Sequence, residues 1–234
     1  TEGSAVYNFQ YANPTRICFG EGQIATLPEL IPAGSRLLVL YGGGSIKQNG
    51  VYEQLTQALA GREWLEFPGI GANPQYDQLM EAVALVKRER IDFLLAVGGG
   101  SVVDGTKFVA AAACFEEGDP WEILRDKAPI KGALPLGCVL TLPATGSESN
   151  PASVVSRGEA KLSFYNPLVQ PVFAVLDPAT TYSLPPRQVG NGVVDAFVHI
   201  LEQYLTFPVG GEVQDRLAEG LLQVLVDNGP RALA

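Results

Sequence analysis

The chain has 234 residues, of which 47% are hydrophobic and 18% are charged, and its net charge is −9. These values are typical of a globular protein with a large core. The acidic surplus argues against nucleic acid or an anionic membrane as a partner, because both require a basic surface. No apolar run approaches the roughly 20 residues that span a bilayer, and residues 1–10 lack the features of a secretory signal.

From Arg36 to Leu176 short apolar segments alternate with amphipathic ones. Strands flanked by helices in this way are typical of a doubly wound, mostly parallel α/β sheet of the Rossmann type. Such sheets bind ligands beyond the carboxyl ends of their strands. The expected strands are 37–41, 64–67, 93–97, 137–142 and 172–176, and the expected helices are 51–60, 76–89 and 102–114.

The pattern changes at Leu184-Pro-Pro-Arg187, after which strand signals are almost absent. Two helices are expected, at 189–205 and 213–227. We therefore place a domain boundary near Pro186, with an α/β domain over 1–186 and the start of an all-helical domain over 187–234. Because two helices enclose little core, we expect the helical domain to be incomplete in this chain.

The strand at 93–97 runs directly into Gly98-Gly-Gly-Ser101 and then into a helix-compatible segment. Glycines allow close approach of the backbone to a ligand, and a helix N-terminus favours an anionic group. A nucleotide pyrophosphate is the natural occupant of such a turn. The alternative is a plain tight connection, but a second copy at Gly42-Gly-Gly-Ser45, after the strand at 37–41, argues against it.

The glycine-rich segment at 42–45, which we call the first because it comes earlier in the chain than the second at 98–101, also bears on which coenzyme is bound. NAD-binding folds of this type usually carry an acidic residue after an early strand, where it binds the ribose 2′-hydroxyl. Here the segment reads Tyr41-Gly-Gly-Gly-Ser45, with Lys47 close behind and no carboxylate. A 2′-phosphate suits backbone N–H groups, a serine and a lysine, so the sequence favours NADP over NAD.

Small hydroxyl residues follow the strand at 137–142, in Thr141-Leu-Pro-Ala-Thr145-Gly-Ser147. They are suited to hydrogen-bonding a ribose, a phosphate or a carboxamide, although an ordinary hydroxyl-capped turn explains them equally well. Lys161 lies in a polar stretch further on, where a solvated lysine is the plain interpretation.

The single histidine, His199, lies four residues after Asp195 in an apolar segment. On a helix the two side chains share one face. The apolar surroundings predict a buried helix, in which an unpaired carboxylate is costly. Binding of a divalent cation by both side chains removes that cost, and a local ion pair is the alternative. Glu202 is a possible third ligand, but it is equally suited to a salt bridge between helices.

Cys18, Cys114 and Cys138 are odd in number and widely separated, unlike the ligands of a metal site. Cys114 ends an alanine-rich helix and Cys138 begins an apolar strand, so both are expected to be buried. Reduced thiols indicate a cytoplasmic protein.

These segments resemble those of the iron-containing (group III) alcohol dehydrogenases, most closely the NADPH-dependent aldehyde reductase and butanol dehydrogenase branch. The resemblance implies a dehydroquinate synthase-like architecture, with a dinucleotide-binding α/β domain, a helical domain and an active site between them. It also implies a homodimer. The segments that carry it are Asn13–Gly20, Gly98–Asp104, Thr141–Glu148 and Gly192–His199.

The resemblance implies a divalent metal, Fe²⁺ or Zn²⁺, held by one Asp and three His. Asp195 and His199 match the first two ligands, and the other two are expected further along the helical domain than this chain extends. For NADP(H) it implies that Gly42, Gly43, Gly44 and Ser45 meet the 2′-phosphate and that Gly98, Gly99, Gly100, Ser101 and Asp104 hold the pyrophosphate and neighbouring groups. It further implies that Thr141, Thr145 and Ser147 line the ribose–nicotinamide side, with Lys161 and Leu184 near the nicotinamide end.

We therefore expect an enzyme that transfers hydride between NADP(H) and a small aldehyde or primary alcohol, with the metal polarising the substrate oxygen. No residue is assigned as the general acid. One alternative is a dehydroquinate synthase-like lyase, whose phosphorylated substrate requires basic residues that the segment around Asp195 lacks. Another is a nucleotide-binding fragment with an incomplete metal site.

Overall fold

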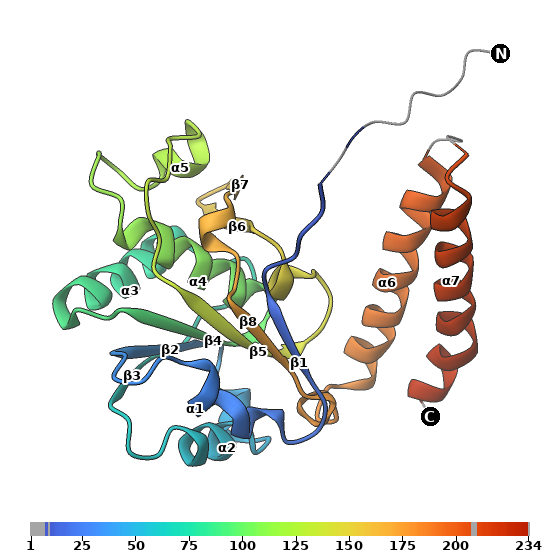
Figure 1. The fold of residues 1–234 in the computed structure, drawn as a ribbon, viewed down its shortest axis with the longest axis horizontal. Helices are drawn as coiled ribbons and strands as arrows, with labels where there is room; N and C mark the ends of the chain where they lie inside the picture. Colours follow the sequence, from blue (N-terminus) through green and yellow to red (C-terminus); the bar gives the residue numbers. More distant parts are fainter. Residues whose placement is uncertain (1–7, 9, 207–209, 234) are drawn as a thin grey trace. The chain divides into compact units, whose positions relative to one another are not determined.

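The computed structural model describes residues 8, 10–206 and 210–233. They divide into two compact units, Asn13–Tyr182 and Ser183–Ala234, the second grouped with the residues that precede Asn13. The division falls just before Pro186, where the sequence analysis places a boundary. The first unit contains the sheet with its helices, and the second contains two long helices (Figure 1).

The first unit is built on a six-stranded sheet in which every pairing is parallel, in the order β1-β8-β5-β4-β2-β3. The predicted parallel α/β sheet is therefore confirmed, and each predicted strand lies within two residues of its expected ends. The edge strand β1 was not predicted. The strands are β1 (Arg16–Phe19), β2 (Leu37–Tyr41), β3 (Trp64–Phe67), β4 (Phe93–Gly99), β5 (Leu136–Leu142) and β8 (Phe173–Leu176).

The inner strands are buried on both faces, because side chains alternate between the two faces and helices cover each of them. Leu38 and Leu94 belong to the core on the α3 and α4 side, whereas Val39 and Leu95 belong to the core on the α1 and α2 side. Figure 1 shows these two helix layers on opposite faces of the sheet. The helices are α1 (Leu27–Leu30), α2 (Val51–Ala58), α3 (Tyr76–Glu89), α4 (Gly100–Ala113) and the short α5 (Glu122–Arg125).

A two-stranded antiparallel hairpin, β6 (Ala152–Arg157) and β7 (Ala160–Tyr165), forms a second sheet. The sequence analysis missed both strands, because the polar residues of this stretch obscure the apolar positions. Val155 and Phe164 are buried in the same core as α4. The hairpin is therefore anchored by its apolar face beside the helix that follows the second glycine-rich segment.

The second unit contains α6 (Pro186–Thr206) and α7 (Glu212–Ala232), as predicted, although α7 continues through Pro230. The two helices pack closely at Gly229 of α7 and Val193 of α6. A Cβ atom added to Gly229 would lie only 2.8 Å from Val193 Cγ1. The expected burial of the helix around Asp195 is wrong for this structure. No described residue of α6 is buried, because in the described part of this unit only α7 covers it.

Within the described residues, no helix is long and apolar enough to span a bilayer. The three cysteines are free thiols. Cys138 is buried in β5, as predicted, but Cys114 is exposed, so the prediction of a buried thiol there is wrong. The helix α4 ends at Ala113, so Cys114 is its C-cap residue rather than part of its buried face.

Candidate functional site

Two glycine-rich segments meet beside the first turn of α4. Because β2 and β4 are adjacent and parallel, the segments that end them lie at the same carboxyl edge of the sheet. The Val102 side chain lies beside both segments. A Cβ atom added to Gly42 would lie 3.8 Å from Val102 Cγ2, and one added to Gly98 would lie 2.6 Å from it. The structure thus brings together the two glycine-rich segments that the sequence analysis selected.

The junction of β4 and α4 contains no separate turn. The sequence predicted a turn at Gly98–Ser101, but β4 continues through Gly99 and α4 begins at Gly100. A side chain at Gly98 would collide with Val102, and one at Gly100 would collide with Thr145. Close packing of strand, helix and the 141–147 segment therefore requires glycine at both positions.

The N-terminus of α4 carries no capping side chain and no acidic residue in its first turn. The first N–H groups of a helix lack partners within the helix and carry partial positive charge. This helix has 14 residues, so its dipole is well developed. An anionic group such as a phosphate is the favoured ligand at such a terminus.

The other glycine-rich segment is open to solvent. Nothing lies within 4 Å of a Cβ built on Gly43, and Gly43 and Ser45 are exposed. Gly44 has a φ of 98°, a left-handed conformation that favours glycine. The backbone at this edge therefore has room for a ligand, and packing does not account for the glycine at 43.

Glu66 lies beside this segment, and the sequence analysis missed it. Its carboxylate, on β3, accepts hydrogen bonds from the hydroxyls of Tyr41 and Tyr52 and lies 3.2 Å from Lys47 Nζ. Burial raises the pKa of Glu66, but these contacts outweigh it and lower the pKa overall. The segment after β2 contains no carboxylate, as the sequence analysis noted, but β3 pairs with β2 and places the Glu66 carboxylate beside Lys47. A glutamate within the apolar run of β3 was the available signal.

The 141–147 segment is linked to the second glycine-rich segment through Asp104. Ser147 is only 2% exposed, and its hydroxyl donates to Asp104 Oδ1 at 2.6 Å. The backbone N–H of Val154 donates to Asp104 Oδ2 at 3.2 Å. Burial raises the pKa of Asp104, while the bond from Ser147 acts in the opposite direction. Thr141 is in β5, and Thr145 packs against Gly100.

Lys161 is exposed on β7, and its ammonium donates to Asn73 Oδ1 at 2.7 Å. Asn73 belongs to the loop before α3, so Lys161 links the hairpin to that loop. The Lys161 charge also helps to lower the pKa of Asp104, against the larger effect of burial. Leu184 belongs to the second unit, so its predicted place near the coenzyme stays a prediction.

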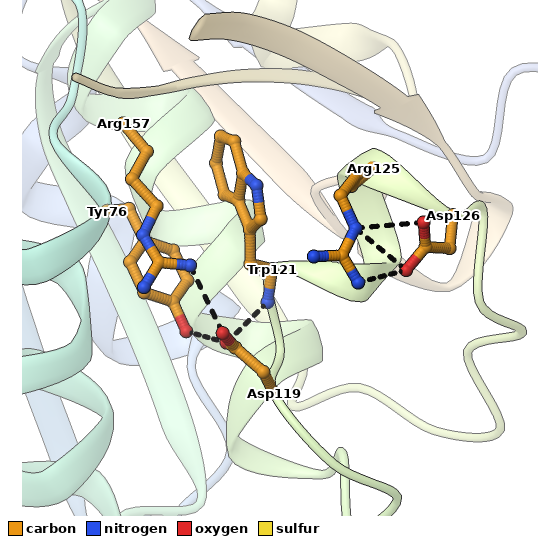
Figure 2. Close-up of polar contacts among 6 residues, drawn as sticks. All are labelled: Tyr76, Asp119, Trp121, Arg125, Asp126 and Arg157. Carbon is orange, nitrogen blue, oxygen red and sulfur yellow. Dashed lines mark hydrogen bonds and ion pairs between the residues drawn. The ribbon is translucent and has the colours of Figure 1, made fainter.

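A cluster of aromatic and charged side chains holds the hairpin against α3 (Figure 2). The Arg157 guanidinium lies 4.3 Å from the centre of the Tyr76 ring and 5.7 Å from that of Trp121. Asp119 accepts hydrogen bonds from the Tyr76 hydroxyl, from the Trp121 backbone N–H at 2.9 Å and from Arg157 at 3.1 Å. These bonds lower the pKa of Asp119, although burial raises it. Sequence reasoning missed the cluster because its members come from separate segments.

Asp195 and His199 lie on one face of α6, as their spacing predicted. His199 Nε2 is 3.6 Å from Asp195 Oδ2, and the two side chains are 60% and 47% exposed. The pair supplies one nitrogen and one oxygen ligand, a set suited to Zn²⁺ or Fe²⁺ in kind. Among the described residues, however, no group of three potential ligands forms. Glu202, on the same helix, does not complete a site.

A doubly wound parallel sheet with glycine-rich segments at its carboxyl edge defines a Rossmann-like α/β domain. The family model for iron-containing alcohol dehydrogenase matches residues 14–178. The chain therefore belongs to the iron-containing alcohol dehydrogenase family, and the predicted resemblance is confirmed.

Individual relatives agree with this assignment. The chain is 59% identical over 230 residues to the NADPH-dependent aldehyde reductase YqhD of Escherichia coli, covering 97% of this chain and 59% of that protein. It is 44% identical over 231 residues to the probable NADH-dependent butanol dehydrogenase 1 of Bacillus subtilis, with the same two coverages. The chain thus spans about three fifths of the length of these curated relatives.

Solved structures show the same fold. The crystal structure of E. coli YqhD matches with a TM-score of 0.94 at 58% identity, covering 98% of this chain and 60% of that one. The NADH-dependent butanol dehydrogenase A of Thermotoga maritima matches with a TM-score of 0.87 at 41% identity, covering 96% and 57%. These matches include both the sheet and the helices that follow it.

Proposed function

We propose that this chain belongs to an oxidoreductase that transfers hydride between NADP(H) and a small aldehyde or primary alcohol. The observation that carries the proposal is the meeting of two glycine-rich segments beside the uncapped N-terminus of α4, around Val102. The family membership supports the reaction class. The aldehyde is inferred from the names of the relatives, one an aldehyde reductase and others butanol dehydrogenases.

The coenzyme pyrophosphate would bind at Gly98–Ser101. Backbone N–H groups at the start of α4 are aligned with the helix dipole, which favours negative charge. Asp104, one turn further, carries a carboxylate that suits a hydroxyl or amide donor rather than a phosphate. We therefore assign Gly98, Gly99, Gly100 and Ser101 to the pyrophosphate and Asp104 to a neighbouring donor group.

The adenosine 2′-phosphate would bind at Gly42, Gly43, Gly44 and Ser45. The open space at Gly43 supports this assignment. Lys47 contributes positive charge, but Glu66 neutralises part of it. Preference for NADP(H) therefore depends more on the exposed backbone than the sequence alone suggested. The relatives differ here, one being named for NADPH and another for NADH.

The nicotinamide side would lie along Thr141, Thr145 and Ser147, with Lys161 and Leu184 nearby. Thr145 is the exposed hydroxyl of the segment, whereas the Ser147 hydroxyl is already bonded to Asp104. We therefore expect Thr145 to contact the coenzyme directly and Ser147 to act through Asp104.

A divalent metal, Fe²⁺ or Zn²⁺, would bind to Asp195 and His199. When bound, such a cation polarises a carbonyl oxygen and stabilises the developing alkoxide. Asp195 contributes a negatively charged oxygen and His199 a neutral nitrogen. The pair fits the cation in ligand type but not in number, so we derive no catalytic step from it.

A homodimer follows from the family resemblance. A cytoplasmic location is supported by the three free thiols, and a role without nucleic acid by the net charge of −9.

The test is NADPH consumption with butanal, with and without added Zn²⁺ or Fe²⁺, together with NADPH binding measured by its fluorescence. Metal-dependent oxidation of NADPH is the expected result. Tight NADPH binding without turnover would favour the alternative of a nucleotide-binding fragment. Absence of NADPH binding would contradict the proposal.

A further inference from the structure

A lysine is completely buried behind the second glycine-rich segment. Lys107, on α4, is 0% exposed. Its ammonium donates three hydrogen bonds: to Ser147 Oγ at 2.8 Å, Asn150 Oδ1 at 3.1 Å and the Ala152 carbonyl at 2.7 Å. Every donor of the charged group thus has an acceptor, which is the condition for burying it. All three acceptors lie between Ser147 and Ala152.

The hydrogen bonds from Lys107 have a fixed direction. An ammonium group has no lone pair, so the Ser147 oxygen must accept from it. The single hydroxyl hydrogen of Ser147 is then available for Asp104 Oδ1, 2.6 Å away. Lys107, Ser147 and Asp104 therefore form a chain in which each group orients the next.

We propose that Lys107 is a positioning residue for the coenzyme, which through Ser147 holds the Asp104 carboxylate in place beside the glycine-rich start of α4. This inference rests on the proposed function, in which Asp104 binds a donor group of NADP(H). Lys107 itself is buried and does not touch the coenzyme. Its effect on binding passes through the orientation of one hydroxyl.

The chain of hydrogen bonds gives coenzyme binding a distinctive pH dependence. Burial lowers the pKa of Lys107 to about 8, although the Asp104 and Glu148 carboxylates act in the opposite direction. The Cys138 thiol also lies nearby, and burial raises its own pKa, so it is neutral in this range. Above that pH the neutral amine has a lone pair and can accept from Ser147, so the hydroxyl no longer has to donate to Asp104. NADPH affinity should therefore fall as the pH rises through about 8. The Lys161 charge also acts on Asp104, in the direction that lowers the pKa of that carboxyl.

The decisive variant is Ser147→Ala, which removes the middle of the chain and leaves Lys107 its other two acceptors. Its matched control is Ser153→Ala. Ser153 is equally buried and also bonds to Asp104, but its hydroxyl donates to the backbone carbonyl at 2.8 Å rather than to the carboxylate. The control therefore reports the cost of losing a buried hydroxyl beside the same residue.

The measurement is the Kd of NADPH for the full chain, by fluorescence titration, from well below to well above pH 8. We expect Ser147→Ala to weaken binding roughly tenfold at neutral pH, the effect of losing one hydrogen bond to a charged group, and to abolish the decline above pH 8. Ser153→Ala should keep that decline. Lys107→Met should behave like Ser147→Ala where it folds, as checked by circular dichroism.

The outcomes are distinguishable. A Kd and pH profile of Ser147→Ala equal to those of the unmodified chain would overturn the positioning role while leaving the proposed function intact. Failure of the unmodified chain to bind NADPH at any pH would overturn the proposed function, and this inference with it.

Discussion

The candidate functional residues of the two units differ in how deeply the elements that carry them are buried. In Asn13–Tyr182 the glycine-rich segments end strands that are buried on both faces, and the neighbouring polar side chains are tied into buried hydrogen bonds. In Ser183–Ala234 Asp195 and His199 lie on a helix with no buried residue in the described part. The difference shows what a core contributes: it fixes the geometry of a site from several directions, whereas an exposed helix fixes only the spacing along itself.

The largest expected effect compares a buried leucine in the first unit with an exposed leucine in the second. Leu95→Ala, on β4, should lower the free energy of unfolding by about 2–5 kcal/mol, because it leaves a cavity in a packed interior. The same change at Leu221, which is 53% exposed on α7, should change it by less than about 0.5 kcal/mol. Urea unfolding followed by circular dichroism tests both. Equal losses for the two variants would contradict the distinction.

The next effect concerns the open glycine-rich segment. Gly43→Asp should raise the Kd of NADPH relative to that of NADH by about tenfold, or about 1.4 kcal/mol, because it places a carboxylate against the 2′-phosphate. Gly43→Asn is the matched control, of similar size but uncharged. Both variants should fold, since no atom lies within 4 Å of the added Cβ. An unchanged ratio of the two dissociation constants would argue against the 2′-phosphate assignment.

Two carboxylates in Figure 2 differ in how many groups they bind, and their contributions to stability should differ accordingly. Asp119 accepts bonds from three groups, whereas Asp126 pairs only with the exposed Arg125 in the bonds drawn. Asp119→Asn should cost about 1 kcal/mol of stability, reduced by solvent screening. Asp126→Asn should cause no measurable change.

The Asp119 effect should depend on pH. Because hydrogen bonds lower the pKa of Asp119 in the folded chain against the opposing effect of burial, its stabilisation is present above the unfolded value of about 3.9 and is lost as the pH falls through the folded value. The difference between Asp119→Asn and the unmodified chain should therefore be full near neutrality and vanish in acid. Urea unfolding at several pH values measures it, and a difference that persisted in strong acid would contradict the assignment.

The smallest effect on folding is expected in the second unit. Asp195→Ala should leave unfolding unchanged, yet lower the affinity for Zn²⁺ by at least the roughly tenfold that loss of a supporting group costs. Asp215→Ala, on α7, is the control. Zn²⁺ titration by calorimetry distinguishes the two, and equal affinities for both variants would remove Asp195 from the metal site.

The sequence predicted five of the six strands because they are short apolar runs, two of which, β2 and β4, lead directly into glycines. The positions of Gly42 and Gly98 were also predictable, since parallel neighbours end at one edge. A glutamate within the apolar run of β3 marked Glu66 as unusual, but its contacts and those of the Asp119–Arg157 cluster were not predictable. Their partners come from other strands and loops, and local patterns do not reveal such contacts. Ser147 was selected correctly as part of the site, but its bond to Asp104 depends on tertiary packing.

In the helical unit the sequence predicted the helices but not their exposure. The apolar residues around Asp195 predicted a buried helix, yet the described structure leaves that helix exposed on the sides that α7 does not cover. The i, i+4 spacing of Asp195 and His199 was predictable from helical geometry alone. The burial of a helix depends on which other elements pack against it, and the apolar pattern of the helix does not identify those elements.

Hydrogen–deuterium exchange with and without NADPH tests most directly whether the carboxyl edge of the sheet binds the coenzyme. We expect protection at 41–47, 98–104 and 141–149. The polar groove at the opposite edge, lined by Arg36, Arg62 and Trp64 among others, should exchange as before. Protection of that groove, or NADPH binding that leaves the three segments unprotected, would contradict coenzyme binding at the carboxyl edge.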